Sequence, residues 1–131
     1  MIDHMSTYAT NYTATRDFYI AAFAPLKYPM LFEEMASLDN DWPTRRMCAF
    51  GPDNKPIFWV IEVKSPATPR HTAFVAANRS AVADFYHAGL ASGGQDNGAP
   101  GLRPIYHEHY YGAFLLDPDG NNVEAVCHHH E

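Results

Sequence analysis

Two stretches of the sequence, DHMSTYATNYTATRDFYIAAF at 3–23 and RHTAFVAANRSAVADFYHAGL at 70–90, resemble each other and decide the fold. Aligned without a gap at an offset of 67 residues, they are identical at eight of 21 positions, well above the level that unrelated segments share. The identities include a DFY triplet and a histidine near each start, His4 and His71. Self-similarity at a fixed period is the signature of a repeated architecture, so the sequence predicts an internal duplication.

Each half contains patterns for one helix with strands around it. Apolar residues at helical spacing predict helices at 14–24 and 79–91, and Asn11 and Thr13 are candidate N-caps of the first. Short apolar or alternating runs between turn residues predict strands at 2–9, 28–35, 45–50, 58–63, 71–76, 110–116 and 122–127. The glycine- and proline-rich segment 93–104 is expected to be a loop. The order predicted for each half is β-α-β-β-β.

The composition is that of one small domain with more acidic than basic residues. The chain has 131 residues, 47% of them hydrophobic, and a formal net charge of −6. This charge argues against nucleic-acid binding, which relies on clustered Lys and Arg. No apolar stretch is long enough to span a bilayer, the N-terminus lacks a signal-peptide pattern, and two cysteines make no disulfide framework. We therefore expect a cytoplasmic protein with no membrane or nucleic-acid partner.

A further motif, DPDGNNVEAV at 117–126, has the pattern of a closing hairpin. Together with His4, His71 and the repeated DFY, it makes the whole chain resemble the vicinal-oxygen-chelate superfamily, which includes glyoxalase I, bleomycin-resistance proteins and extradiol dioxygenases. The resemblance implies an α+β fold in which two tandem βαβββ modules form a curled mixed sheet around a cup that holds a divalent metal. The modules would be 1–64 and 70–128 of a single domain, 1–131.

Three residues match the metal-ligand positions of that superfamily: His4, His71 and Glu124. Two imidazoles and one carboxylate suit a divalent ion such as Fe, Zn, Ni, Mn or Co and leave positions open for substrate oxygens. One histidine at a strand start is more often structural or exposed than a ligand. Matches on three strands, two of them related by the repeat, favour a ligand set. Glu124 lies among apolar residues, where an unpaired carboxylate would be costly.

The module-one equivalent of Glu124 is a departure from glyoxalase I. The turns Gly51-Pro52-Asp53 and Asp117-Pro118-Asp119 align with each other. This alignment of the two Pro-Asp turns puts Phe58 where glyoxalase I has a carboxylate. Glu62, four residues further along the same face, is a possible fourth ligand if the register shifts. Without it, the set resembles the three-ligand sites of non-haem iron oxygenases. Phe58 and Trp59 are candidates for an aromatic wall that binds substrate, although core packing is the more common role of such residues.

The segment HEHYY, from His107 to Tyr111, is rich in groups that titrate or donate hydrogen bonds. In a strand, His107, His109 and Tyr111 would share one face, and these three are the candidate catalytic residues. Glu108 and Tyr110 would share the other face. The sequence does not decide which set faces the cup, and an edge strand with polar residues in solvent is an equally ordinary arrangement.

Other polar residues offer weaker signals. Arg103 is a candidate for binding an anionic substrate group through a two-pronged contact, or it is an ordinary surface residue. His87 is expected on the surface of the second helix. The run His128–His130 at the chain end is expected to be a solvated tail rather than a metal site.

These residues favour a divalent-metal-dependent enzyme that acts on a small molecule with vicinal oxygens. The reaction would be of the lyase, isomerase or ring-cleaving dioxygenase type. The alternative is a metal-free small-molecule binding protein of the bleomycin-resistance type, and an interaction protein with a degenerate cup is the least favoured. Members of the superfamily often pair modules between chains, so we expect a homodimer.

Overall fold

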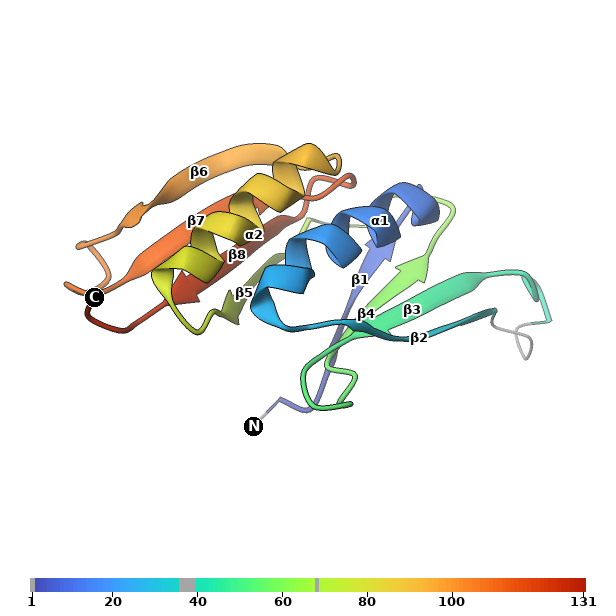
Figure 1. The fold of residues 1–131 in the computed structure, drawn as a ribbon. Helices are drawn as coiled ribbons and strands as arrows, with labels where there is room; N and C mark the ends of the chain where they lie inside the picture. Colours follow the sequence, from blue (N-terminus) through green and yellow to red (C-terminus); the bar gives the residue numbers. More distant parts are fainter. Residues whose placement is uncertain (1, 36–39, 68) are drawn as a thin grey trace.

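In the computed structural model, which describes residues 2–35, 40–67 and 69–131, each half of the chain forms its own four-stranded sheet. The first half contains β1 (Met5–Ala9), α1 (Tyr12–Phe23), the 3-10 helix η1 (Ala24–Leu26), β2 (Met30–Met35), β3 (Arg46–Phe50) and β4 (Phe58–Glu62). The second half contains β5 (His71–Val75), α2 (Arg79–Ala91), β6 (Gln95–Leu102), β7 (Tyr111–Leu116) and β8 (Asn122–Cys127). Figure 1 shows the two sheets and the helices that accompany them.

The two sheets have the same topology. Their strand orders are β1-β4-β3-β2 and β5-β8-β7-β6. In each sheet the first strand runs parallel to the last, and the other pairs are antiparallel. A parallel pair requires a crossover connection, which the helix of each half provides. The predicted α+β fold of two βαβββ units is therefore confirmed.

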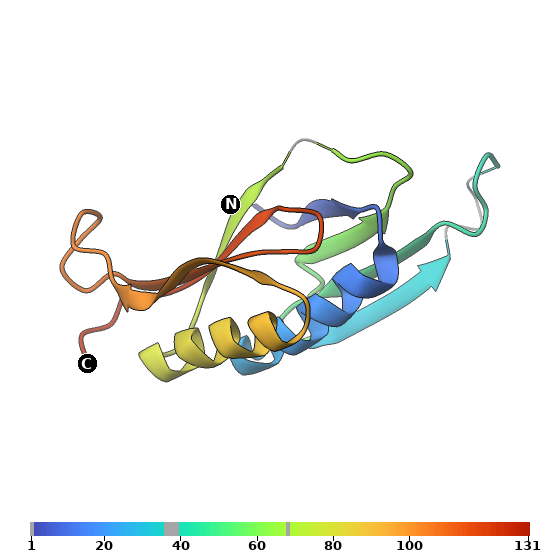
Figure 2. The same cartoon turned by 90° about the horizontal axis from the view of Figure 1, so that it is seen from above.

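The two helices begin in the same way. Asn11 caps α1 by accepting a hydrogen bond from the backbone N–H of Ala14 at 3.1 Å, and Asn78 caps α2 through Ala81 at 2.8 Å. An asparagine in this position satisfies one of the free N–H groups of the first helical turn. These four residues are among the identities of the repeat. The helices pack against each other (Figure 2), and no helix in the described part of the chain is long and apolar enough to cross a bilayer.

One aromatic core joins the two halves. The ring of Phe23 on α1 lies 5.6 Å from that of Phe58 on β4 and 4.8 Å from that of Phe74 on β5. The rings of Phe58 and Phe74 are 5.1 Å apart and nearly perpendicular. Edge-to-face contacts of this kind add to the stabilisation from burial of apolar area. Because all three rings are buried, residues of both halves share one interior.

Each sheet has a helix side, which joins the core, and an open side. On β5, Phe74 is buried in the core, whereas His71 and Val75 on the opposite face are exposed. Alternation along β8 places Val123 on the helix side and Glu124 on the open side. The open side of the second sheet thus carries both His71 and Glu124.

The segment 93–104 is not a loop as predicted, because most of it forms β6. This strand is irregular, with register shifts on either side of Gly98, which has a φ of +149°. It is also the edge strand of its sheet, where Pro100 is tolerated because one side of the strand needs no ladder hydrogen bonds. The glycine and proline content that suggested a loop therefore marks an irregular edge strand.

Candidate functional site

The candidate site is centred on Glu124, on the open side of the second sheet. Its side chain is buried, and its Oε1 lies 3.2 Å from Nε2 of His71 on the neighbouring strand β5. The His71 ring is half-exposed. A buried carboxylate is costly unless it is paired or binds a metal. The strands thus bring together two of the three predicted ligands.

Tyr110 closes one side of this pair. Its hydroxyl donates a hydrogen bond to Oε2 of Glu124. Burial and the neighbouring Glu124 carboxylate both raise the pKa of the Tyr110 hydroxyl, whereas the more distant Arg103 acts weakly in the opposite direction. The tyrosine therefore stays protonated at neutral pH and acts as a donor. Gly112 makes room for its ring, since a Cβ there would lie 3.2 Å from a ring carbon of Tyr110.

Phe114 stands between this pair and Arg103. It lies directly opposite Glu124 in the β7–β8 register. Its ring stacks against the imidazole of His71, with centroids 6.3 Å apart and planes 21° apart. The guanidinium of Arg103 lies over the same ring, 5.4 Å from its centroid. The open side therefore offers an acid, an imidazole, a phenol and a guanidinium around one aromatic ring.

The third predicted ligand, His4, does not join this cluster. Its Nδ1 lies 2.6 Å from the Asp3 carboxylate, and the residue lines a pocket together with Val75 at the far end of β5. At the other end of the same strands, the guanidinium of Arg70 lies over the ring of Tyr8. Strands β1 and β5 thus pass each other in opposite directions, and their histidines are at opposite ends.

Within the described ranges, no group of three or more His, Cys, Asp and Glu side chains is arranged to hold a metal. The pair of Glu124 and His71 nevertheless fits part of a metal site. One carboxylate oxygen and one imidazole nitrogen are typical donors for divalent first-row ions. The buried carboxylate also needs a positive partner, which the half-exposed imidazole supplies only when protonated.

The register of the first sheet corrects the predicted equivalent of Glu124. Ser6 pairs with Trp59 on β4, as Ala73 pairs with Glu124 on β8, and Ser6 and Ala73 correspond in the repeat. Trp59, not Phe58, therefore occupies the position of the module-one carboxylate. Phe58 is buried in the aromatic core, 2% exposed, and is not on the open side. Trp59 lies on the open side, its ring 5.7 Å from that of Phe32.

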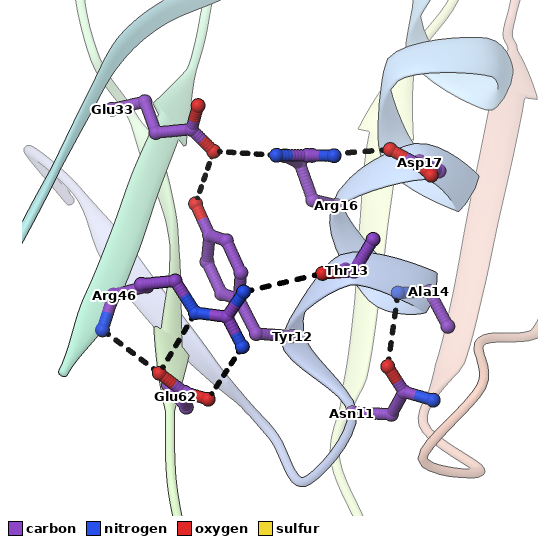
Figure 3. A network of polar contacts seen from close by, with 9 residues as sticks. All are labelled: Asn11, Tyr12, Thr13, Ala14, Arg16, Asp17, Glu33, Arg46 and Glu62. Carbon is purple, nitrogen blue, oxygen red and sulfur yellow. Dashed lines mark hydrogen bonds and ion pairs between the residues drawn. The ribbon is translucent and has the colours of Figure 1, made fainter. Parts of the chain in front are cut away.

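Glu62, the possible fourth ligand, faces the helix side of the first sheet. Figure 3 shows its carboxylate held by Arg46, whose Nε and Nη2 donate to its two oxygens at 3.2 and 2.9 Å. Arg46 also donates to Thr13 on α1. These hydrogen bonds lower the pKa of Glu62. The carboxylate is thus committed to an ion pair on the opposite face from Trp59.

The three candidate catalytic residues lie apart from Glu124. Tyr111 packs against the core, with the guanidinium of Arg79 over its ring. His107 and His109 lie in the loop before β7 rather than on a strand, so alternation does not govern them. Tyr110, which the sequence placed in the opposite set, is the residue that reaches Glu124.

The end of the chain, His128–Glu131, is exposed as expected, but it also contacts this loop. Nε2 of His107 lies 2.9 Å from Nδ1 of His128, and the rings of His109 and His130 are 4.9 Å apart. Glu131 accepts a hydrogen bond from the backbone N–H of Arg79 at the start of α2, at 2.7 Å. The C-terminal residues thus stand beside Tyr110, whose ring is 5.4 Å from that of His128.

Sequence reasoning missed the site roles of Tyr110 and Phe114. Phe114 carried no signal of its own, because an aromatic residue in a strand is most often core. The glycines on the same face gave a usable signal. Gly101 and Gly112 face each other across β6 and β7, and each leaves space for a neighbouring side chain. Glycine inside a strand often marks such a close approach.

Comparison with known proteins places this geometry in a known fold. No protein-family model matches the sequence, and neither does any curated protein. Among solved structures, a glyoxalase/bleomycin resistance protein from Albidiferax ferrireducens is 23% identical, with 95% of this chain and 96% of that chain covered and a TM-score of 0.75. A glyoxalase-related enzyme from Fulvimarina pelagi is 15% identical, with 97% and 87% covered and a TM-score of 0.71.

A third solved structure contains a metal. It is a mutant of a fosfomycin resistance protein from Listeria monocytogenes in complex with Mn(II) and 1S,2S-dihydroxypropylphosphonic acid. It is 14% identical, with 96% of this chain and 90% of that chain covered and a TM-score of 0.68. At these identities the likeness shows the fold. The chain has the glyoxalase/bleomycin resistance/dioxygenase fold, which confirms at this level the resemblance inferred from the sequence.

Proposed function

We propose that this protein is a divalent-metal-dependent enzyme that acts on a small molecule with two neighbouring oxygen atoms. The reaction is of the lyase, isomerase or ring-cleaving dioxygenase class. The observation that carries the proposal is the buried carboxylate of Glu124, 3.2 Å from the half-exposed imidazole of His71 on the open side of a sheet. The Mn(II) complex of the fosfomycin resistance protein, a protein of the same fold, supports the choice of a metal.

In this proposal a second copy of the chain supplies the third ligand. His4 and His71 lie at opposite ends of β1 and β5, so one chain does not unite them. A two-fold dimer that placed β1 of one copy beside β5 of the other would bring His4 to Glu124 and His71, twice per dimer. This arrangement accounts for an open side that carries two ligands and lacks a third.

The residues of the chain have separate roles. The metal, when bound by Glu124, His71 and the second copy's His4, would polarise substrate oxygens and stabilise negative charge on them. Tyr110 keeps its proton at neutral pH, because burial and Glu124 raise its pKa. Its hydroxyl donates its single proton to the Glu124 carboxylate and so orients that ligand. Phe114 covers one flank of the site and limits the access of water.

The test combines metal content with subunit mixing. Protein without an added tag is loaded with Zn²⁺, Mn²⁺ or Co²⁺, dialysed and assayed by elemental analysis. We expect one metal per chain, and a loss of affinity of at least about 100-fold in either His4→Ala or Glu124→Gln. When these two variants are co-expressed, mixed dimers contain one intact site, so metal content should recover to about a quarter of wild type if subunits pair at random.

The control variant is His87→Ala, which removes an imidazole from α2, outside the proposed site. It should leave metal content unchanged. Recovery in the mixture fails if the site lies within one chain, and this result would overturn the shared-site arrangement. Wild-type protein that binds none of these metals, and whose stability a chelator does not change, would instead be a metal-free binding protein. The aromatic open side of the first sheet, with Phe32 beside Trp59, would serve that alternative.

A further inference from the structure

Arg103 lies in a trough on β6 that leaves room for its guanidinium. Its side chain runs back over β6, where Gly98 and Gly101 present no side chains. A Cβ on Gly101 would lie 3.2 Å from Nη1 of Arg103, and one on Gly98 would lie 3.3 Å from Nη2. Nη2 donates to the carbonyl of Ala99 at 2.7 Å, and the ring of Phe114 lies beneath the guanidinium. These contacts fix the orientation of a side chain that is otherwise long and flexible.

The charge of Arg103 has no acidic partner. In the described part of the chain, no carboxylate lies within ion-pair distance of it, and no acceptor lies within hydrogen-bond distance of its Nε. Arg16 and Arg46, by contrast, are each paired with glutamates. Among the described residues, Arg70 and Arg79 likewise lie over aromatic rings without an ion pair, but Arg103 is the one beside Phe114, on the open side that carries Glu124.

The trough belongs to the same open side as the candidate metal site. The backbone N–H of Arg103 donates to the carbonyl of Tyr110 at 2.7 Å, so the two residues close the base of one loop. From this base, Tyr110 extends to Glu124, while Arg103 extends over Phe114. Strands β6 and β8 flank β7 on opposite sides, which puts Phe114 between the guanidinium and the carboxylate.

We propose that Arg103 is an anchor for an anionic group of the substrate, a carboxylate, at a fixed distance from the oxygens that the metal would bind. Nη1 and Nη2 each donate to one backbone carbonyl, of Leu102 and Ala99, which leaves Nε and the second hydrogen of each Nη for the planar fork of a carboxylate. The low polarity of the Phe114 ring strengthens the contact. The substrate class is therefore a small carboxylic acid with a separate pair of vicinal oxygens. This inference rests on the proposed function for the oxygen pair, whereas the anion site itself requires no metal.

The test separates the two claims by using metal-free protein first. Benzoate and its neutral isostere benzamide are titrated separately, and binding is followed by NMR chemical shifts. We expect benzoate to bind at least about tenfold more tightly than benzamide, with the largest shifts at Arg103, Phe114 and the loop before β7. Arg103→Gln should abolish this preference. Arg103→Lys keeps the charge but not the fork, and should retain only part of it.

The control is Arg79→Gln. Arg79 also lies over an aromatic ring, that of Tyr111, but at the start of α2 on the helix side. This variant should keep the preference for benzoate. Equal binding of benzoate and benzamide by the wild type, or a preference that survives in both Arg103 variants, overturns the anchor. If the preference depends on Arg103 while no metal binds, the anchor stands and the proposed enzymatic function fails.

Discussion

The open sides of the two sheets differ far more than the helix sides. On the second sheet, Glu124 occupies the position that Trp59 occupies on the first, and a polar set of Tyr110, His71 and Arg103 surrounds it. On the first sheet, Trp59 pairs with Ser6 and has its ring beside that of Phe32. The two halves of the repeat thus place a carboxylate and an indole at equivalent positions.

The residues that the halves still share explain the difference. The phenylalanines of the DFY triplets, Phe18 and Phe85, are both fully buried, and the shared asparagines cap both helices. These positions determine the helices and the core, where a change costs stability. Positions on the open sides carry no such constraint, so each copy is free to take a different chemical role. A duplicated fold can therefore contribute ligands from one copy and an apolar wall from the other.

The largest effect that we predict is on stability, and it distinguishes the first Pro-Asp turn from the second. Gly51 begins the first turn where Asp117 begins the second. A Cβ on Gly51 would lie 1.7 Å from the carbonyl oxygen of Lys55, so the backbone must move to admit any side chain. We expect Gly51→Ala to lower the free energy of unfolding by about 3 kcal/mol. Urea denaturation measures this change.

The comparison for Gly51→Ala is Gly120→Ala in the second turn. Gly120 has a φ of +86° but no atom within 4 Å of the Cβ position, so its substitution adds strain without a clash. A cost of about 1 kcal/mol is expected there. If the two variants are equally stable, the first turn is more plastic than its geometry indicates.

The next effect concerns Asp117, the side chain that the first turn lacks. It is buried, and it accepts hydrogen bonds from the Tyr19 hydroxyl at 2.7 Å and from the backbone N–H of Asn121 at 2.9 Å. In Asp117→Asn, the new NH₂ group must face one of these donors. We expect a loss of about 2 kcal/mol in the free energy of unfolding, because a buried polar group is left without a partner.

Asp53, an aspartate of the first turn that aligns with Asp119, is the control for this test. It is exposed, and its φ of +52° is one that asparagine adopts readily. Asp53→Asn should therefore change the free energy of unfolding by less than about 0.5 kcal/mol. Equal costs at Asp53 and Asp117 would show that the buried hydrogen bonds of the second turn contribute little.

These turns also show what the sequence could and could not predict. The repeat, the caps and the element order follow from local periodicity, and the structure confirms the fold they predict. The predicted equivalence of Phe58 in the first half with Glu124 in the second was one residue off. The position equivalent to Glu124 is Trp59, because the first half has one more residue between the proline of its turn and this position. A shift of one residue exchanges the faces of a strand, so Phe58 lies in the core and Trp59 on the open side.

The candidate site was predictable only in part, for a similar reason. His71 and Glu124 lie inside strands, where alternation fixes the side of the sheet. The choice between Tyr110 and Tyr111 depends on where β7 begins after an irregular loop, and no local pattern specifies that residue. The position of the Arg103 side chain depends on Gly98 and Gly101 of β6, an edge strand that the sequence predicted to be a loop. His4 remains a predicted ligand, since its proposed partners belong to a second copy.

A smaller effect, on metal affinity, is expected when a carboxylate is introduced on the first sheet at the position equivalent to Glu124. Under the proposed function, Trp59→Glu adds a carboxylate at the position that matches Glu124. We expect divalent metal to bind about tenfold more tightly, as measured by competition with a fluorescent chelator. Trp59→Gln, which loses the same indole but adds no charge, controls for loss of the Phe32 contact. Identical affinities in these two variants would mean that Trp59 does not face the metal.

The smallest effect tests the helix side of the first sheet, where Glu62 has an ion pair that Cys127, its counterpart on β8, cannot form. Arg46 is about half-exposed, so solvent screens the pair, and Glu62→Gln should cost only about 0.5 kcal/mol at pH 7. Hydrogen bonds from Arg46 lower the pKa of Glu62 in the folded state. Its contribution is therefore present above the pKa of an unfolded glutamate and is lost as the pH falls through the folded value.

Urea titrations of the wild type and Glu62→Gln across this pH range measure that contribution. The difference between them should shrink toward zero in acid, because protonated Glu62 resembles glutamine. Glu34→Gln, which removes an exposed carboxylate from β2, should show a smaller difference at every pH. A difference for Glu62 that stayed constant with pH would assign its role to packing against Arg46 rather than to charge, and the two halves would then differ on their helix sides in shape alone.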